Sequence, residues 1–213
     1  MLGVGADVLP TVHVMVFDGL SDWEIGHALS QLNAPMFGPP RYVVRTMAAS
    51  REPIVTAGGL RIVPDLSVDE LRPADSALLI LPGGGGWDSG GNSAAVRLAS
   101  DFLAAGLPVA AICGATVGLA RAGLLDTRRH TSNARAYLAA TGYAGASLYQ
   151  DEPVVQDQHL ITASAMAHLE FARCILAQLQ VYPPPLLEAW YGLFATQDPA
   201  YFDAAMAALA AGA

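Results

Sequence analysis

Short apolar runs of strand length alternate along the chain with longer segments of helical periodicity. The apolar runs predict buried strands at 12–17, 41–48, 76–82 and 108–113. The periodic segments predict helices at about 22–32, 93–104, from 115 onward and 170–179. Apolar strands separated by helices are typical of a parallel sheet covered on both faces, so we expect an α/β fold with a mostly parallel sheet.

Two segments depart from this alternation. Residues 54–65 contain a Gly-Gly pair between two apolar stretches and predict a small hairpin. Residues 154–162 predict two short strands at the edge of the sheet.

The C-terminal part of the chain has a different pattern. After Gln180 there is no strand signal, and we expect two helices within about 183–211, each preceded by Pro. The chain shows no repeat and no linker rich in Gly and Ser. We therefore predict one domain over 1–213 with its core at about 11–180.

Composition and charge exclude two broad classes. The 213 residues are 53% hydrophobic and 14% charged, which excludes general disorder. The net charge is −8, and the 11 basic residues, all Arg, are scattered. Because nucleic-acid binding needs a basic stripe, we predict no nucleic-acid partner.

The cysteine count and the hydropathy bear on compartment and metals. Cys113 and Cys174 are too few for a disulfide framework or a four-ligand zinc site, so we predict no metal. No basic residue precedes Arg41, which argues against a signal peptide. Residues 102–120 carry no charge, but Gly and Pro divide them into a strand and a helix. We expect a cytoplasmic protein with no membrane partner.

Cys113 is the most informative candidate for chemistry. It stands between a buried strand and a helix, where a sharp turn presents the side chain at the top of the sheet, as in a nucleophile elbow. The helix N-terminus is expected to lower the pKa of its thiol. The alternative is that Cys113 is a small buried apolar residue.

The glycine loop 83–86 ends another predicted strand. Its backbone N–H groups, together with the amide of Gly114, are candidates to hold an oxyanion. Trp87 and Asp88 follow the loop and are candidates to line the same pocket. The loop lacks the Gly-Lys-Ser/Thr ending of a P-loop, and its spacing is not that of a dinucleotide fingerprint. We therefore predict no cofactor. The alternative is a flexible turn.

Three segments together resemble a known superfamily. LLILPGG, AAICGATVGLARAGLLDTRRHTSN and LITASAMAHLEFA are similar to motifs of the ThiJ/PfpI superfamily, over about residues 11–180. Asp-Trp-Glu at 22–24 and the Cys-Gly elbow resemble a bacterial, glutamine amidotransferase-like subgroup. The resemblance implies a flavodoxin-like three-layer sandwich and, in addition, a homodimer.

The resemblance also implies roles for individual residues. Cys113 corresponds to the nucleophile, Glu24 to the acidic residue that bonds it, and His130 to the neighbouring histidine. A protonated carboxyl in a desolvated site can donate a hydrogen bond to a thiolate, which agrees with the pairing of Glu24 and Cys113. The alternative for Glu24 is a solvated charge in a first helical turn. The implied oxyanion donors are the amides of Gly83, Gly84 and Gly114.

The chain also departs from the better-described subfamilies. Gly114 stands where protease-like members have His, which weakens a peptidase interpretation. Ala115 and Val117 replace the Gly and Gln of true glutamine amidotransferases. The Cys-Thr of isonitrile-hydrating relatives is also missing.

His168 and Glu170 form an alternative base pair. Their His-x-Glu spacing is similar to the one by which amidotransferases orient a histidine toward the nucleophile. The alternative is that Glu170 is an ordinary acid in the first turn of a helix.

Three functions follow as hypotheses. The leading one is an enzyme that attacks a carbonyl or amide carbon of a small molecule through Cys113, with glyoxals and amides as substrates that the resemblance implies. The second is a stress-responsive protein in which Cys113 is oxidised to a sulfinic acid beside Glu24. The third is a non-catalytic association module.

Overall fold

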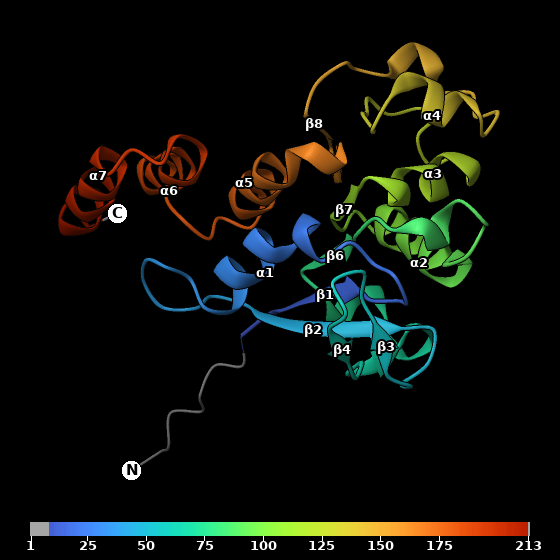
Figure 1. The fold of residues 1–213 in the computed structure, drawn as a ribbon, viewed down its shortest axis with the longest axis horizontal. Coiled ribbons are helices and arrows are strands. Elements are labelled where there is room, and N and C mark those ends of the chain that lie inside the picture. Colours follow the sequence, from blue (N-terminus) through green and yellow to red (C-terminus); the bar gives the residue numbers. More distant parts are fainter. Residues whose placement is uncertain (1–8, 213) are drawn as a thin grey trace.

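A seven-stranded sheet forms the centre of the molecule in a computed structural model that describes residues 9–212 (Figure 1). Part of the N-terminal segment that argued against a signal peptide, residues 1–8, lies outside this range. The strand order is β5-β2-β1-β6-β7-β9-β8, and every pair is parallel except β8 with β9. The strands are β1 (Thr11–Met15), β2 (Val43–Ala48), β5 (Leu66–Ser67), β6 (Leu78–Leu81), β7 (Val109–Ile112), β8 (Val154–Asp157) and β9 (Leu160–Ala163). The predicted hairpin is a separate antiparallel pair, β3 (Ile54–Val55) with β4 (Arg61–Ile62).

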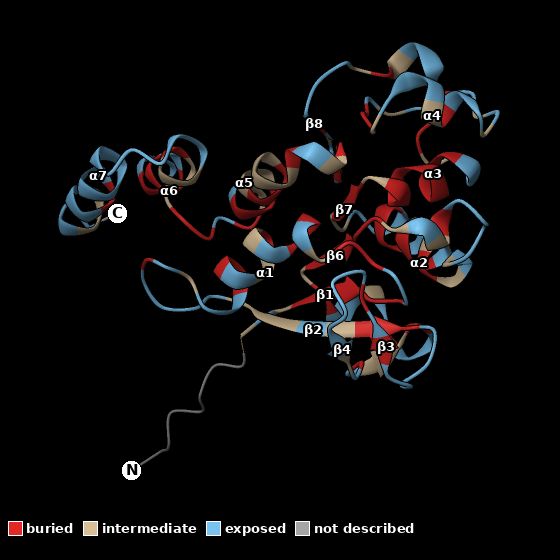
Figure 2. Ribbon diagram, in the orientation of Figure 1, coloured by how far each residue is buried: buried red, intermediate tan, exposed pale blue. Residues whose placement is uncertain are grey.

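Helices cover both faces of the sheet, as the continuous apolar strands predicted. α1 (Gly26–Asn33) packs against α5 (His168–Gln178), and α2 (Ser93–Ala104) packs against α3 (Gly114–Arg121), β6 and β7. The two central strands β6 and β7 are buried along their whole length (Figure 2). The arrangement is the predicted flavodoxin-like three-layer sandwich.

The strand order reverses between β1 and β6, which is the topological switch point of the sheet. The strands β1, β2 and β5 build one side, and the strands β6, β7, β9 and β8 build the other. In open parallel sheets the carboxyl ends of strands at such a point leave a crevice where ligands bind. The segments that leave β1, β6 and β7 carry Glu24, Gly83 and Cys113, so the topology brings these three candidates to one edge.

The C-terminal helices α6 (Pro184–Thr196) and α7 (Ala200–Ala210) lie at one end of the molecule, away from α3 and the short helix α4 (Arg135–Ala139) (Figure 1). α6 packs on α5 and α7. α7 leaves the side chains of Tyr201, Phe202 and Met206 exposed. None of the helices within residues 9–212 combines the length and apolar character needed to cross a membrane.

Two expectations about individual elements are wrong in detail. The strand β9 is internal, because it pairs with β7 as well as with β8, so only β8 is an edge strand. The predicted helix at 22–32 is divided at Ile25 into a 3-10 turn, Asp22–Glu24, and α1. The uncharged segment 102–120 divides into the end of α2, the strand β7 and the start of α3, as predicted.

Gly118 marks the closest approach of α3 to the buried ring of Trp87. A Cβ at this position would lie 2.7 Å from Cε3 and 2.9 Å from Cζ3 of Trp87, and 3.1 Å from Cγ2 of Val96. We expect Gly118→Ala to lower the free energy of unfolding by about 1–2 kcal/mol, because overpacking exceeds the gain in helix propensity. Urea denaturation measures the change.

The matched control is Gly26→Ala. Gly26 is also helical, and a Cβ there would meet nothing within 4 Å. We expect this variant to be as stable as the wild type or more stable by up to about 1 kcal/mol. Equal effects of the two substitutions would contradict the packing argument.

Candidate active site

Cys113 occupies the sharp turn between β7 and α3. Its backbone has φ 56° and ψ −125°, a conformation that costs a non-glycine residue on the order of 1–3 kcal/mol. Hydrogen bonds on both sides hold the turn: the Cys113 N–H donates to Ala163 (3.0 Å), and its carbonyl accepts from the Thr116 hydroxyl (2.6 Å). The predicted elbow geometry is therefore present, and the half-buried thiol lies at the N-terminus of α3.

The residue after the elbow has no room for a side chain. A Cβ on Gly114 would lie 2.9 Å from the carbonyl oxygen of Gly84 and 3.1 Å from Cδ1 of Trp87. This contact explains why the chain has Gly at the position where protease-like members have His.

Glu24 lies against Cys113 at the end of the 3-10 turn. Its side chain is buried, with the residue 1% exposed. The Gly83 N–H donates to Oε2 at 2.5 Å, whereas Oε1 is buried and meets no hydrogen-bond partner among the described residues. Burial raises the pKa of the Glu24 carboxyl, although the hydrogen bonds from Gly83 and Cys113 oppose the rise. Glu24 is thus a stronger base than a solvated carboxylate.

Gly83 is the point where the three segments touch. A Cβ there would lie 2.5 Å from Cβ and 2.8 Å from Sγ of Cys113, and 2.6 Å from Oε2 of Glu24. Glycine is therefore required by close approach. The Gly83 amide binds Glu24 and is not directed at a ligand, so it does not serve as the expected oxyanion donor. The Gly84 backbone forms a β-bridge with Leu20.

Asn133 is a site residue that the sequence did not single out. Its Nδ2 donates to Cys113 Sγ at 3.2 Å, and its Oδ1 accepts from the Ala165 N–H at 2.9 Å. The second bond fixes which end of the amide faces the sulfur. In the sequence, Asn133 is only one polar residue in the segment RRHTSN. Its role depends on Ala165, which follows the strand β9 and is distant in the chain.

The pKa of the Cys113 thiol differs from the expectation. Burial raises its pKa to about 11, and the negative charge of Glu24 adds to the rise. Hydrogen bonds from Asn133 and the Gly114 amide oppose it. The expected lowering by the helix N-terminus is wrong, because desolvation and a neighbouring carboxylate outweigh the helix. The resting thiol holds its proton at neutral pH.

His130 is fully buried, and both of its ring nitrogens are engaged away from Cys113. Nδ1 lies 2.7 Å from the carbonyl oxygen of Arg128, and Nε2 lies 2.9 Å from the Tyr143 hydroxyl. Because a carbonyl only accepts, Nδ1 carries the proton and Nε2 accepts from Tyr143. Burial lowers the pKa of His130, so the ring is neutral. These contacts give His130 a structural role in this loop.

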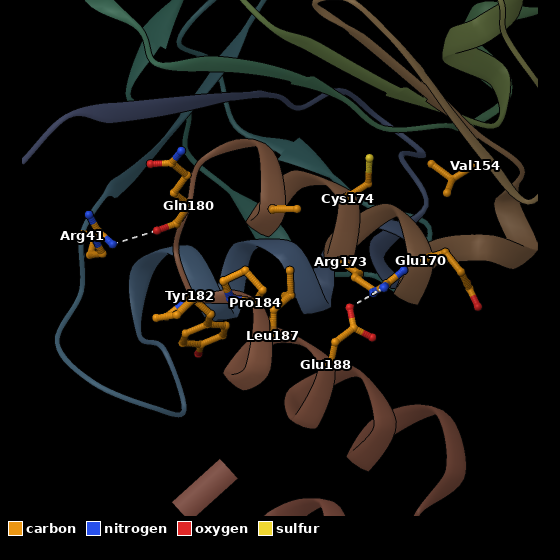
Figure 3. A pocket seen from close by; sticks show the side chains of 12 residues that line it. Arg41, Val154, Glu170, Arg173, Cys174, Gln180, Tyr182, Pro184, Leu187 and Glu188 are labelled. Atoms are coloured by element: carbon orange, nitrogen blue, oxygen red, sulfur yellow. Dashed lines mark hydrogen bonds and ion pairs between the residues drawn. The ribbon is translucent and has the colours of Figure 1, made fainter. Parts of the chain in front are cut away.

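The alternative pair His168 and Glu170 is also turned away from Cys113. The ring of His168 stacks on His27, with centroids 5.4 Å apart and planes 12° apart. Glu170 accepts a hydrogen bond from the Tyr191 hydroxyl at 3.0 Å. Glu170 lines a separate cavity of about 700 Å³ that also exposes Cys174, shown in Figure 3. Arg173 and Glu188 form an ion pair across that cavity.

A metal centre is not formed by the described side chains. Within residues 9–212, no three side chains of His, Cys, Asp or Glu come together in a way that could hold an ion.

Comparison with known proteins identifies the family of this chain. The sequence profile of the DJ-1/PfpI family matches residues 10–178. The chain belongs to the DJ-1/PfpI family. The segment that matches contains Glu24, Gly83, Cys113 and Asn133, so all four contacting residues lie inside the family region.

Individual relatives cover nearly the whole of this DJ-1/PfpI protein. A Bacillus subtilis protein named "Uncharacterized protease YoaZ" is 41% identical over 90% of this chain and 93% of its own. A second, "Uncharacterized protease YdeA" from the same organism, is 31% identical over 82% and 85%. The crystal structure of a ThiJ/PfpI family protein from Bacillus anthracis has a TM-score of 0.85 at 39% identity, covering 93% of this chain and 96% of that one.

Asn133 provides a test of the hydrogen bonding around the sulfur. We expect Asn133→Ala to raise the pKa of Cys113, because the variant loses an N–H donor that favours the thiolate. At a fixed pH below that pKa, alkylation by iodoacetamide should slow by between about threefold and tenfold, since less thiolate is present. Peptide mass spectrometry over a pH series measures the rate.

Cys174 is the internal control in the same experiment. It lies in α5 and donates to Gln156 Oε1 at 3.3 Å, so its alkylation rate should not change. An unchanged pH profile at Cys113 would show that Asn133 does not act on the thiol.

Proposed function

We propose that this protein is an enzyme that uses Cys113 as a nucleophile on the carbonyl carbon of a small amide or reactive aldehyde. The observation that carries the proposal is the strained turn at Cys113, which points the thiol at a buried carboxyl and the Asn133 N–H. Strain of this kind persists where the surrounding structure enforces it, and it is concentrated at active sites. The names of the two Bacillus subtilis relatives, both "protease", support a hydrolytic reaction.

The first step moves one proton and forms one bond. Glu24, as a carboxylate, takes the proton of the Cys113 thiol while the sulfur attacks the carbonyl carbon. The S–C bond forms, and the electron pair of the C=O π bond moves to oxygen. The N–H groups of Asn133 and Gly114 are the donors available to stabilise that oxygen. With an aldehyde, protonation of this oxygen gives a hemithioacetal.

An amide reacts further. The oxygen lone pair re-forms the C=O bond, the C–N bond breaks, and the proton held by Glu24 passes to the departing nitrogen. The resulting thioester is then hydrolysed by water, which gives the acid and returns the thiol. The sum is one amide and one water converted to one acid and one amine, with the protein unchanged.

The raised pKa of Cys113 supports this function over the redox alternative. Peroxide reacts with the thiolate, and a thiol that holds its proton at neutral pH is oxidised slowly. Substrate attack coupled to proton transfer does not need a preformed thiolate, because Glu24 lies in place to accept the proton. A protonated thiol beside an acceptor for its proton supports an enzyme rather than an oxidation sensor.

Matched cysteine variants test the nucleophile. We expect Cys113→Ser to lose at least about 100-fold in kcat/KM, because the nucleophile is replaced by a weaker one. Cys174→Ser should keep wild-type activity, because Cys174 lies in the separate cavity between α5 and α6. The assays follow loss of methylglyoxal and release of p-nitroaniline from a small anilide.

Wild-type activity in Cys113→Ser would overturn the proposal. Loss of activity in both would mean that folding is the cause, which circular dichroism of each variant would reveal.

Glu24 provides a test of the base. The carboxylate form is active, so kcat/KM should rise with pH through a pKa above the ordinary value of 4.5. Glu24→Gln should lower kcat/KM by on the order of 10²–10⁴ and remove this acid limb, because the amide cannot accept the proton. A pH–rate profile of both proteins decides the point. An acid limb that survives in Glu24→Gln would assign the base to another residue.

A further inference from the structure

A hydrogen-bonded bridge joins two loops beside Cys113. The Tyr137 hydroxyl donates to Asp88 Oδ1 at 2.7 Å. Tyr137 lies in α4, about one helical turn after Asn133, and Asp88 directly follows the turn Gly85–Trp87. The bridge thus connects the segment that bonds the sulfur to the segment that begins at the glycine loop.

The Asp88 end of the bridge is anchored to α3, the helix that follows Cys113. The Arg121 guanidinium, in the last turn of α3, donates to the carbonyl oxygens of Trp87 (2.6 Å) and Asp88 (3.0 Å). The turn before Asp88 also contacts the first residue of α3, where a Cβ on Gly114 would meet Trp87 at 3.1 Å. Asp88 is therefore held in place although its side chain is exposed.

A negative charge on the sulfur of Cys113 would raise the pKa of the Tyr137 hydroxyl. Burial, the hydrogen bond to Asp88 and the charges of Asp88 and Cys113 raise the pKa of Tyr137 well above its ordinary value. The hydroxyl accordingly stays protonated and continues to donate to Asp88 at physiological pH. One neutral hydroxyl lies within electrostatic range of both the carboxylate and the nucleophile.

Two acidic side chains and one cation lie on the segments around Cys113. Asp88 and Glu24 are carboxylates, and the nearby cation Arg121 directs its N–H groups to backbone carbonyls. Arg121 offsets part of the negative charge but forms no ion pair with the Asp88 carboxylate among the described contacts. The carboxylate of Asp88 is exposed, and its Oδ1 accepts the hydrogen bond from Tyr137.

We propose that Asp88, positioned by Tyr137, selects by charge the molecules that reach Cys113. It favours a carbonyl compound that carries an ammonium or another positively charged N–H group, and it disfavours one that carries a carboxylate. That the selected molecules are substrates rests on the proposed function, whereas charge selection at the thiol does not. Asp88 is the selecting group, and Tyr137 is a positioning residue.

Thiol reagents of opposite charge test the proposal without any assay of turnover. Methanethiosulfonates with a trimethylammonium-ethyl or a sulfonato-ethyl group both form a disulfide with the cysteine sulfur and release methanesulfinate. In a Cys174→Ser background only Cys113 remains to react. We expect the cationic reagent to be favoured over the anionic one by about tenfold more than at a model thiol, and less at high salt.

Three variants separate charge from structure. Asp88→Asn keeps an acceptor for Tyr137 but removes the charge, so the preference should fall several-fold toward that of the model thiol. Tyr137→Phe releases the carboxylate and should reduce the preference in part. Asp203→Asn removes the same charge from exposed α7, at the far end of the molecule from α4, and should leave the preference unchanged (Figure 1).

The results that would contradict charge selection differ from those that would contradict the proposed function. A wild-type preference equal to that of a model thiol, or one that Asp88→Asn does not reduce, would overturn charge selection. An intact preference in a protein that turns over neither methylglyoxal nor an anilide would uphold charge selection and contradict the proposed function.

Discussion

The site depends on one close approach, at Gly83, where the ends of three segments meet with no space for a Cβ. The Gly83 amide binds the buried carboxylate of Glu24, and its Cα faces the side chain of Cys113. A parallel sheet brings these segments to one edge, but only a glycine allows the carboxyl and the thiol to touch. This contact holds the buried carboxyl of Glu24 against the thiol, and the bonds to Ala163 and Thr116 hold the strained turn at Cys113.

Burial then sets the chemistry of the pair. Removing a carboxyl and a thiol from water raises the pKa of each, and the charge of Glu24 raises that of Cys113 further. The helix N-terminus and the Asn133 donor oppose this effect without overcoming it. The result is a protonated nucleophile beside a stronger base than a solvated carboxylate, which suits an attack that is coupled to proton transfer.

Much of the fold was predictable because its signals are local. Apolar runs marked the buried strands β6 and β7, and the Gly-Gly pair marked the hairpin of β3 and β4. The position of β9 inside the sheet was not predictable, since strand order depends on which strands pair across the sheet. The homodimer, the single domain and the cytoplasmic location remain predictions.

The sequence by itself determined the parallel α/β architecture, the turn at Cys113 and the glycine loop that contains Gly83, because strand periodicity and turn residues act over a few neighbours. Glu24 was a candidate only through the family resemblance. Only the tertiary structure decided which polar side chains meet the sulfur. Asn133 reaches it because Ala165, from another strand end, orients its amide. His130 does not, because Arg128 and Tyr143 engage both of its nitrogens. Such contacts join residues far apart in the chain, and no local pattern encodes them.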